Sequence, residues 1–506
     1  MLFLRLRINT LSSMKKFSVK SLLTLVILLS VSTLSAQQEG YSIDVKINGL
    51  SNSKLVLGHH FAKAMYPDDT TSIDQNGIGK FTGSKKLVQG LYLFYFEDGT
   101  YFEVMVGEDQ NFSIETDTGK YVENLKVKGS LDNEIFSDFQ IYMMVKQKEL
   151  RDLQGKIEAT TDEAEKNKLQ EELQALGNER LNKVNSIVEE HPDLFVSTFL
   201  KATLDIEVPD SIKDDGVARY TYYKAHYFDN FDIGDVRLLH TPLYEDKIMN
   251  YLDRIVVQAP DSIIVEVDKF FAKPRHDSIL YRYMLITMFK KYGKSQYMGM
   301  DAVQVHIAKY YYIPDAWWSD EKYIDELKER IAILEPLLIG KTAPDVQLRF
   351  VPKEHFIQAE NDTALKKYPH AGSFFKISDI EADFTVLMFW EANCSHCKKA
   401  VPHMYEVYKD TLQEQNIQVI SISTLFGEDG KQKWIDFVNK NELYDWVNAW
   451  NPYSYDYKEI YDVRTTPQIY LLNKDKEIIG KKLGVENIVE LINAYKKHNK
   501  KDEQTN

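Results

Sequence analysis

Hydrophobic and polar residues are arranged in short strand-like runs between about residues 41 and 130. The segments Tyr41–Ile47, Leu91–Phe96 and Phe102–Val106 are rich in β-branched and aromatic residues, which is typical of strands. Asp98-Gly99 separates the last two segments, as a tight hairpin turn would. The pattern predicts an antiparallel β domain over residues 37–130, and it assigns that domain no role.

The spacing of apolar residues becomes helical from about residue 131. Apolar residues three and four positions apart recur at Leu150, Leu153 and Ile157, at Leu169, Leu173 and Leu176, and at Leu181, Val184 and Ile187. Each set lies on one face of a helix. Thr160 and Glu163 fit a capping box that starts the second stretch, so we expect an antiparallel pair of helices. Residues 131–336 are therefore predicted to form a central all-α region.

Strands and helices alternate in the last third of the chain. The apolar run Phe384–Trp390 indicates a buried strand, and Val419–Ser423 and Ile469–Leu472 indicate two more. Glu477–Gly480 follows across a turn as a fourth strand, and residues 487–497 form the last predicted helix. This order predicts an α/β fold on a mixed sheet for residues 337–498, with a polar tail over residues 499–506. The predicted architecture is multidomain.

The first 36 residues have the order of a secretory signal. Lysines precede an apolar run at residues 22–29, and Ser35-Ala36 offers a small-residue cleavage site. The run is shorter than the roughly 20 apolar residues of a membrane-spanning helix. We expect residues 1–36 to be a signal peptide cleaved after Ala36, and the protein to be exported to the periplasm. An uncleaved membrane anchor is the alternative.

Composition narrows the functions that the chain can have. Of its 506 residues, 44% are hydrophobic and 27% are charged, and the net charge is -14 at pH 7, as in ordinary globular proteins. No cluster of Lys and Arg offsets this charge, so nucleic acid is not an expected partner. The two cysteines, Cys394 and Cys397, are too few for a disulfide framework or a four-thiolate metal cluster.

The candidate chemistry lies in Cys394-Ser395-His396-Cys397, directly after the predicted strand Phe384–Trp390. A Cys-x-x-Cys pair at a strand-to-helix junction has its first sulfur at a helix N-terminus, where free N–H groups favour the thiolate. Because the thiolate attacks in disulfide exchange, we predict Cys394 as the nucleophile and Cys397 as the resolving cysteine. A protonated His396 would stabilise the Cys394 thiolate and make the disulfide more oxidising. Ser395 adds a hydroxyl without charge.

Other roles for this pair of cysteines stay open at this point. Zinc would need four ligands, and His396 and His403 are the additional candidates nearby in the sequence. A structural disulfide across so short a loop adds little stability in the loop-entropy model. A redox-sensing binding or assembly module without turnover is the main functional alternative, and an oxidase or isomerase would use the same residues. A peroxidase is disfavoured, because no set of Thr or Ser, Pro and Arg surrounds Cys394.

Several segments of the chain resemble one known family. The resemblance rests on Phe389-Trp390, Cys394–Cys397 and Pro402, on Thr466-Pro467, and upstream on Ile339–Asp345 and Phe375–Ile380. The first group resembles the active-site region of thioredoxin-fold proteins, and the Thr-Pro pair resembles the loop that faces the dithiol there. The upstream segments are similar to the exported TlpA/ResA-like branch. The whole layout resembles Bacteroidetes multidomain thiol–disulfide oxidoreductases with an N-terminal β domain.

The resemblance implies how the site is built. Pro467 would follow a cis peptide bond, and the Thr466 backbone would be free to pair with an extended substrate segment. Trp390 would be a supporting residue of the site. The family needs no cofactor besides its redox-active disulfide, here Cys394–Cys397, and no metal is expected.

The resemblance also implies partners for the protein. The substrates would be disulfides or dithiols of exported proteins, with apocytochromes among them, and a membrane thiol carrier would donate electrons. Reduction is the favoured direction, although His396 points towards a more oxidising pair.

Three positions depart from the family pattern. Met388 stands where thioredoxins carry a buried acid, and Ala400 stands where the ResA-like branch often has a glutamate. Asn393 replaces the usual tryptophan before the first cysteine. No matching carboxylate is therefore available to take the Cys397 proton. Glu391 is the remaining candidate, and a solvated loop acid is the favoured interpretation of this residue.

Overall fold

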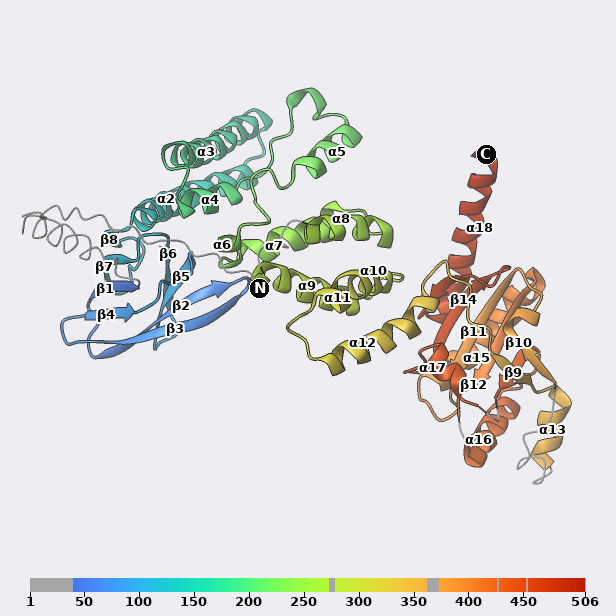
Figure 1. Cartoon of the computed structure of the whole chain (residues 1–506). Helices are drawn as coiled ribbons and strands as arrows, with labels where there is room; N and C mark the ends of the chain where they lie inside the picture. The colour runs from blue at the N-terminus through green and yellow to red at the C-terminus, as the bar shows by residue number, and fades with distance from the viewer. Residues whose placement is uncertain (1–39, 273–277, 362–372, 426, 452–453, 506) are drawn as a thin grey trace, which may run out of the picture. The chain divides into compact units, whose positions relative to one another are not determined.

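The computed structural model describes residues 40–272, 278–361, 373–425, 427–451 and 454–505, so the predicted signal peptide lies outside the described residues. The chain forms two compact units that divide between Met249 and Asn250, and each unit is described by itself. The division falls inside the region predicted as all-α, which contributes helices to both units. Figure 1 shows the strands of the first unit in blue and the C-terminal sheet in orange and red.

The N-terminal strands build a two-layer sandwich. They are β1 Tyr41–Asn48, β2 Ser53–Phe61, β3 Ala64–Ile73, β4 Ile78–Gly83, β5 Gly90–Phe96, β6 Tyr101–Val106, β7 Asn111–Asp117 and β8 Lys126–Lys128. One sheet has the order β4-β1-β7-β8 and the other β3-β2-β5-β6. The ring centroids of Phe81 in the first sheet and Phe94 in the second are 5.6 Å apart, within one shared buried core.

The predicted hairpin at Asp98-Gly99 is confirmed. β5 and β6 pair antiparallel, and Gly99 has a φ of +88°, a left-handed conformation that glycine adopts without the clash of a Cβ. The prediction of an antiparallel domain has one exception, because β1 and β7 pair in parallel. Strands β2 to β6 lie between β1 and β7 in the sequence. A long crossover connection therefore brings β7 beside β1 in the sheet.

A pair of long helices follows the sandwich. The helices of the first unit are α2 Leu131–Ala159, α3 Glu163–Glu190, α4 Phe195–Ala202, α5 Gly216–His226, α6 Val236–Leu239 and α7 Leu243–Asn250, which ends at the division. α2 and α3 form the predicted antiparallel pair, with 2.7 Å between Lys146 Nζ and Glu179 Oε2. The predicted capping box is wrong. Asp162 caps α3 by accepting from two backbone N–H groups, and Thr160 ends α2, because the carboxylate beside the helix start is the better cap.

The second unit opens with further helices. They are α8 Pro260–Ala272, α9 Ser278–Gly293, α10 Asp301–Ile307, α11 Ile313–Asp315 and α12 Glu321–Leu334. α12 starts at its N-cap Asp320, whose side chain accepts from the Tyr323 N–H, and it buries Leu327 and Ile331. Among the described residues, no helix is both long and apolar enough to cross a membrane.

The C-terminal domain is a mixed sheet covered by helices. Its strands are β9 Gln347–Phe350, β10 Phe374–Lys376, β11 Phe384–Trp390, β12 Ile417–Ser423, β13 Val447–Trp450, β14 Gln468–Asn473 and β15 Ile478–Lys481, in the order β10-β9-β13-β12-β11-β14-β15. The central strand β11 pairs in parallel with β12 and antiparallel with β14. The fold class predicted from the sequence is therefore confirmed for this domain.

Helices lie against a sheet that is buried on both faces. The helices are α13 Lys353–Asn361, α15 Cys397–Val407, α16 Gly427–Lys440, α17 Asp456–Ile460 and α18 Ile488–Thr505. Along β11, Met388 and Trp390 belong to one core, whereas Leu387 and Phe389 belong to the core on the opposite face, as the two-residue period of a strand requires. α18 continues through most of the predicted polar tail, whose Lys, Glu and Gln are strong helix formers.

Candidate active site

β11 and α15 bring the two cysteines to the end of the central strand. β11 ends at Trp390 and α15 begins at Cys397, so the dithiol segment occupies the strand-to-helix junction as predicted. The Cys394 N–H donates to the Glu391 carbonyl over 3.1 Å, and the Cys394 carbonyl accepts from the Lys398 N–H over 3.1 Å. These two backbone bonds fix Cys394 at the amino end of α15.

The loop before β14 places a carbonyl against the first sulfur. The Cys394 thiol donates to the Thr466 carbonyl with 3.2 Å between Sγ and O, although the two residues are 72 positions apart. The Thr466-Pro467 peptide bond is cis, as the family resemblance implied. β14 begins one residue later and pairs with β11, so adjacent strands hold the loop and the dithiol together.

The two sulfurs have different surroundings. Cys394 is half-buried, and Cys397 is buried in the core behind it. Burial acts to raise the pKa of Cys394, but hydrogen bonds, first from the Cys397 backbone, outweigh it and lower this pKa below the ordinary value of a thiol. Burial raises the pKa of Cys397 to about 12. Cys394 therefore forms the thiolate more readily than Cys397 does.

We expect Cys394 to react with iodoacetamide at a lower pH than a free cysteine. A lowered pKa increases the thiolate fraction at neutral pH, so the half-maximal rate should fall below about pH 8.5, the ordinary thiol pKa. Cys397 should stay unreactive, since it is buried and its pKa is about 12. Mass spectrometry of the reduced protein across this pH range measures both sites, and the Cys397→Ser variant is the control for Cys394 alone. A Cys394 midpoint at or above that of free cysteine would contradict the expected shift.

The side chains of Ser395 and His396 are exposed beside the two cysteines. The His396 carbonyl accepts from the N–H groups of Lys399 and Ala400, so the histidine backbone belongs to the first turn of α15. Both side chains are therefore exposed to solvent at the start of α15.

Trp390 supports the site from within the core. Its side chain is fully buried, and its indole N–H donates to Ser421 Oγ over 2.8 Å. Its carbonyl accepts from the backbone N–H and the hydroxyl of Thr424, over 2.9 and 3.2 Å. Trp390 therefore fixes the end of β11 against β12, and its ring lies beneath the site.

Glu391 is not the solvated loop acid that the sequence favoured. Its side chain is 26% exposed and accepts from Thr424 Oγ1 over 3.0 Å and from Lys458 Nζ over 3.4 Å. Both donors come from segments far away in the sequence, which is why the local pattern did not indicate them. Met388, at the position of the usual buried acid, lies in the apolar core.

Two functional candidates that the sequence analysis missed, Arg330 and Asp462, meet beside the Thr466 loop. Asp462 Oδ2 accepts from Arg330 Nη2 on α12 over 2.6 Å, and Asp462 Oδ1 accepts from Arg464 Nε over 2.8 Å. Arg330 and Asp462 are 132 positions apart, so no local motif could have signalled their contact.

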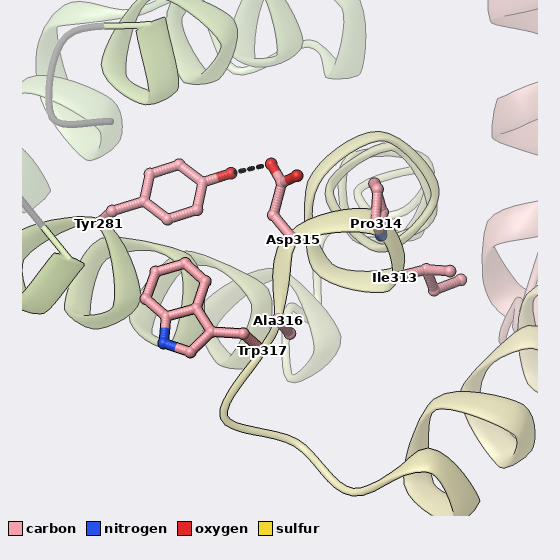
Figure 2. Close-up of a pocket in the computed structure, with 6 residues that line it drawn as sticks. All are labelled: Tyr281, Ile313, Pro314, Asp315, Ala316 and Trp317. Atoms are coloured by element: carbon pink, nitrogen blue, oxygen red, sulfur yellow. Dashed lines mark hydrogen bonds between the residues drawn. The ribbon is translucent and has the colours of Figure 1, made fainter. Parts of the chain in front are cut away.

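A metal site or a cavity would be the other kind of candidate site among the described residues outside the dithiol segment. Within the described residues, no group of three His, Cys, Asp or Glu side chains could hold a metal ion. A cavity of about 490 Å³ in the helical part of the second unit is lined by Tyr281, Ile313, Pro314, Asp315, Ala316 and Trp317. Figure 2 shows the Tyr281 hydroxyl directed at Asp315, with 2.6 Å between the two oxygens. The described lining contains no thiol or histidine.

Family models match three regions of the chain, and the model that matches the C-terminal region is the one with a described fold. The thioredoxin-like family matches residues 382–478. Two domains of unknown function, DUF4369 and DUF5106, match residues 41–136 and 158–333.

Two bacterial relatives carry names that describe thiol–disulfide exchange. Thiol-disulfide oxidoreductase ResA of Oceanobacillus iheyensis is 24% identical over 141 residues, which are 28% of this chain and 62% of ResA. Sporulation thiol-disulfide oxidoreductase A of Bacillus subtilis is 27% identical over 134 residues, which are 24% of this chain and 77% of that protein.

The solved structures that resemble this chain include one from Cytophaga hutchinsonii and one from Bacteroides caccae. A domain of a possible thiol-disulfide isomerase from Cytophaga hutchinsonii is 27% identical and covers 33% of this chain and 98% of its own, with a TM-score of 0.27. A thioredoxin-like protein from Bacteroides caccae is 19% identical and covers 57% of this chain and 98% of its own, with a TM-score of 0.42. The sheet, the dithiol and the cis-proline loop are in place, and residues 382–478 form a thioredoxin-like domain that is similar to bacterial thiol–disulfide oxidoreductases such as ResA.

Proposed function

We propose that this protein reduces disulfides of exported proteins through Cys394 and Cys397. The observation that carries the proposal is the contrast between the two sulfurs. Cys394 is half-buried at the start of α15, has a lowered pKa and faces the Thr466 carbonyl. Cys397 lies buried behind it with a pKa of about 12. A partly exposed attacking thiol and a protected resolving thiol are what disulfide exchange requires.

The reaction would proceed in two exchange steps. The Cys394 thiolate attacks one sulfur of the substrate disulfide, a Cys394–substrate disulfide forms, and the other substrate sulfur leaves as a thiolate that takes a proton. Cys397 then loses its proton and attacks the Cys394 sulfur. This second step releases the remaining substrate thiolate, which is protonated, and leaves the Cys394–Cys397 disulfide. Two electrons pass from the protein to the substrate, and the reverse sequence would oxidise a dithiol.

The loop at Thr466 and Pro467 would align the substrate. Its backbone lies against Cys394 Sγ, and an extended segment that pairs with this backbone would present its disulfide to the sulfur. Main-chain pairing of this kind tolerates many sequences, which suits a protein that acts on several exported partners.

Each turnover would leave the protein oxidised, so the proposal includes an electron donor. We assign this role to a membrane thiol carrier, and we place the reaction in the periplasm. The signal-like order of residues 1–36 supports export, and the similarity to ResA supports the chemistry.

We expect the Cys397→Ser variant to accumulate mixed disulfides with its substrates. Without the resolving sulfur, the Cys394–substrate bond formed in the first step persists. The full chain would be incubated with a periplasmic extract, and its adducts separated on non-reducing gels and identified by mass spectrometry. A variant lacking both cysteines is the control. Adducts no more abundant than those of the control would count against the proposal.

An oxidase or isomerase would use the same residues in the other direction. The exposed His396 between the cysteines would favour this alternative in its protonated form, because a cation beside the thiolate stabilises the reduced form. A redox-sensing binding module is the other alternative. It would bind its partner equally well after Cys394→Ser and would show no turnover.

A further inference from the structure

The loop that ends at Thr466 is anchored to the sheet at its start. Tyr461 is fully buried, and its carbonyl accepts from Gln468 Nε2 over 2.9 Å and from the Tyr470 hydroxyl over 2.7 Å. The Val463 N–H donates to the Lys458 carbonyl over 2.7 Å. The backbone on both sides of Asp462 is therefore held by the C-terminal domain itself.

The Asp462 side chain is held by Arg464 from within that domain and by Arg330 from outside it. Both of its carboxylate oxygens accept from the guanidinium of Arg330 on α12, a two-pronged contact that fixes orientation as well as distance. Asp462 is 13% exposed and has a φ of +48°. Burial acts to raise the pKa of Asp462, but the bonds from Arg330 and Arg464 outweigh it and lower this pKa. The carboxylate therefore stays ionised and paired at neutral pH.

A second ion pair, which has a buried lysine, joins the preceding helices to the sheet. Lys481 on β15 has a side chain that is only 5% exposed, and it pairs with Asp301 on α10. The same ammonium group donates to the Leu337 carbonyl over 2.7 Å. A buried charge is costly unless it is paired, so these contacts oppose separation of the helical segment from the domain.

We propose that Arg330 is a positioning residue for the dithiol site. It acts through Asp462 on the loop whose Thr466 carbonyl faces Cys394, and it sets where the substrate-pairing backbone lies relative to the sulfur. Helix α12 would then be part of the active-site framework, although it lies outside the thioredoxin-like domain. The substrate part of this inference rests on the proposed function.

The test compares four forms of the full chain. These are the wild type, Arg330→Ala, Arg330→Lys and the control Lys328→Ala, which removes an exposed charge from the same helix. The rate of mixed-disulfide formation between Cys394 and a peptide disulfide is measured in a Cys397→Ser background. We expect Arg330→Ala to lower this rate roughly tenfold, since a small misplacement in a site has effects of this order or larger. Arg330→Lys keeps the charge without the two-pronged contact, so its rate should lie between those of Arg330→Ala and the wild type. The rate of Lys328→Ala should match that of the wild type.

Alkylation of the buried Cys397 distinguishes a positioning role of Arg330 from a purely structural role. In chains that keep both cysteines, Cys397 should stay protected from alkylation in Arg330→Ala, because the domain remains folded. A Cys394 rate within about twofold of the wild type, a difference within the range of neutral surface substitutions, would overturn the proposal. So would a Cys397 that becomes as reactive as in the unfolded chain.

Hydrogen exchange distinguishes failure of this inference from failure of the proposed function. A wild type that reacts with peptide disulfides no faster than a free thiol would contradict the proposed function alone. The positioning role would then be judged by the Val463 amide, whose bond to Lys458 lies beside Asp462. Faster exchange of this amide in Arg330→Ala, but not in Lys328→Ala, supports the role, and unchanged exchange contradicts it.

Discussion

Replacement of Cys394 by serine is expected to abolish reduction of a peptide disulfide by this protein. A hydroxyl forms no nucleophilic anion at neutral pH, and the sulfur that Thr466 faces would be lost. Turnover driven by dithiothreitol should fall to the rate of that reductant alone. The assay follows release of the peptide thiol, with the protein and the peptide held at fixed concentrations.

Two further variants make this expectation specific. Cys397→Ser should also stop turnover, but it should still form the mixed disulfide in a single round. Ser395→Ala removes an exposed hydroxyl from the same turn and should keep the rate within about twofold, as neutral surface changes do. Turnover by Cys394→Ser above the dithiothreitol background would show that another group carries the reaction.

Replacement of Trp390 by alanine is expected to destabilise the C-terminal domain by about 3–5 kcal/mol, the usual cost of truncating a buried aromatic side chain. The side chain is fully buried in the core under the site, and Ser421 would lose its indole donor. The effect should appear as a lower urea midpoint, because the cavity and the lost burial affect only the folded state.

The buried Cys397 provides a local reporter of this destabilisation. In a Cys394→Ser background, Cys397 is the remaining thiol, so its alkylation reports opening of this domain rather than of the whole multidomain chain. Trp317→Ala is the matched control, because that indole is 62% exposed and its loss should cost within about 0.5 kcal/mol. Equal midpoints for Trp390→Ala and Trp317→Ala would contradict the structural role of Trp390.

Much of the C-terminal domain could be predicted from the sequence because its signals are local. β11 is a nearly continuous apolar run and β12 is rich in Ile and Val, which is the pattern of strands buried on both faces. The strand-to-helix junction followed from the dithiol segment, and the cis bond before Pro467 followed from the family resemblance. Each of these features is encoded within a few neighbouring residues.

The features that the sequence missed depend on distant partners. β13 is four residues long and contains Asn448, whose amide donates to the Leu443 carbonyl over 2.6 Å. A strand this short that contains a polar residue shows no clear alternation of hydrophobic and polar residues. Glu391 is held by Thr424, which directly follows β12, and by Lys458 on α17 rather than by its neighbours. Arg330 and Asp462 are 132 positions apart. Such contacts arise from tertiary packing, so no local pattern reveals them.

The reduction potential of the Cys394–Cys397 pair tests the central claim most directly. The full chain would be equilibrated with defined ratios of reduced and oxidised glutathione or dithiothreitol, and free thiols trapped and counted by mass. A reversible two-electron couple close to that of thioredoxin, roughly -270 mV, is the predicted result. A couple near roughly -120 mV, as in a strong disulfide donor, would contradict the reductive direction. The absence of any reversible couple would contradict the assignment of this site to thiol–disulfide exchange.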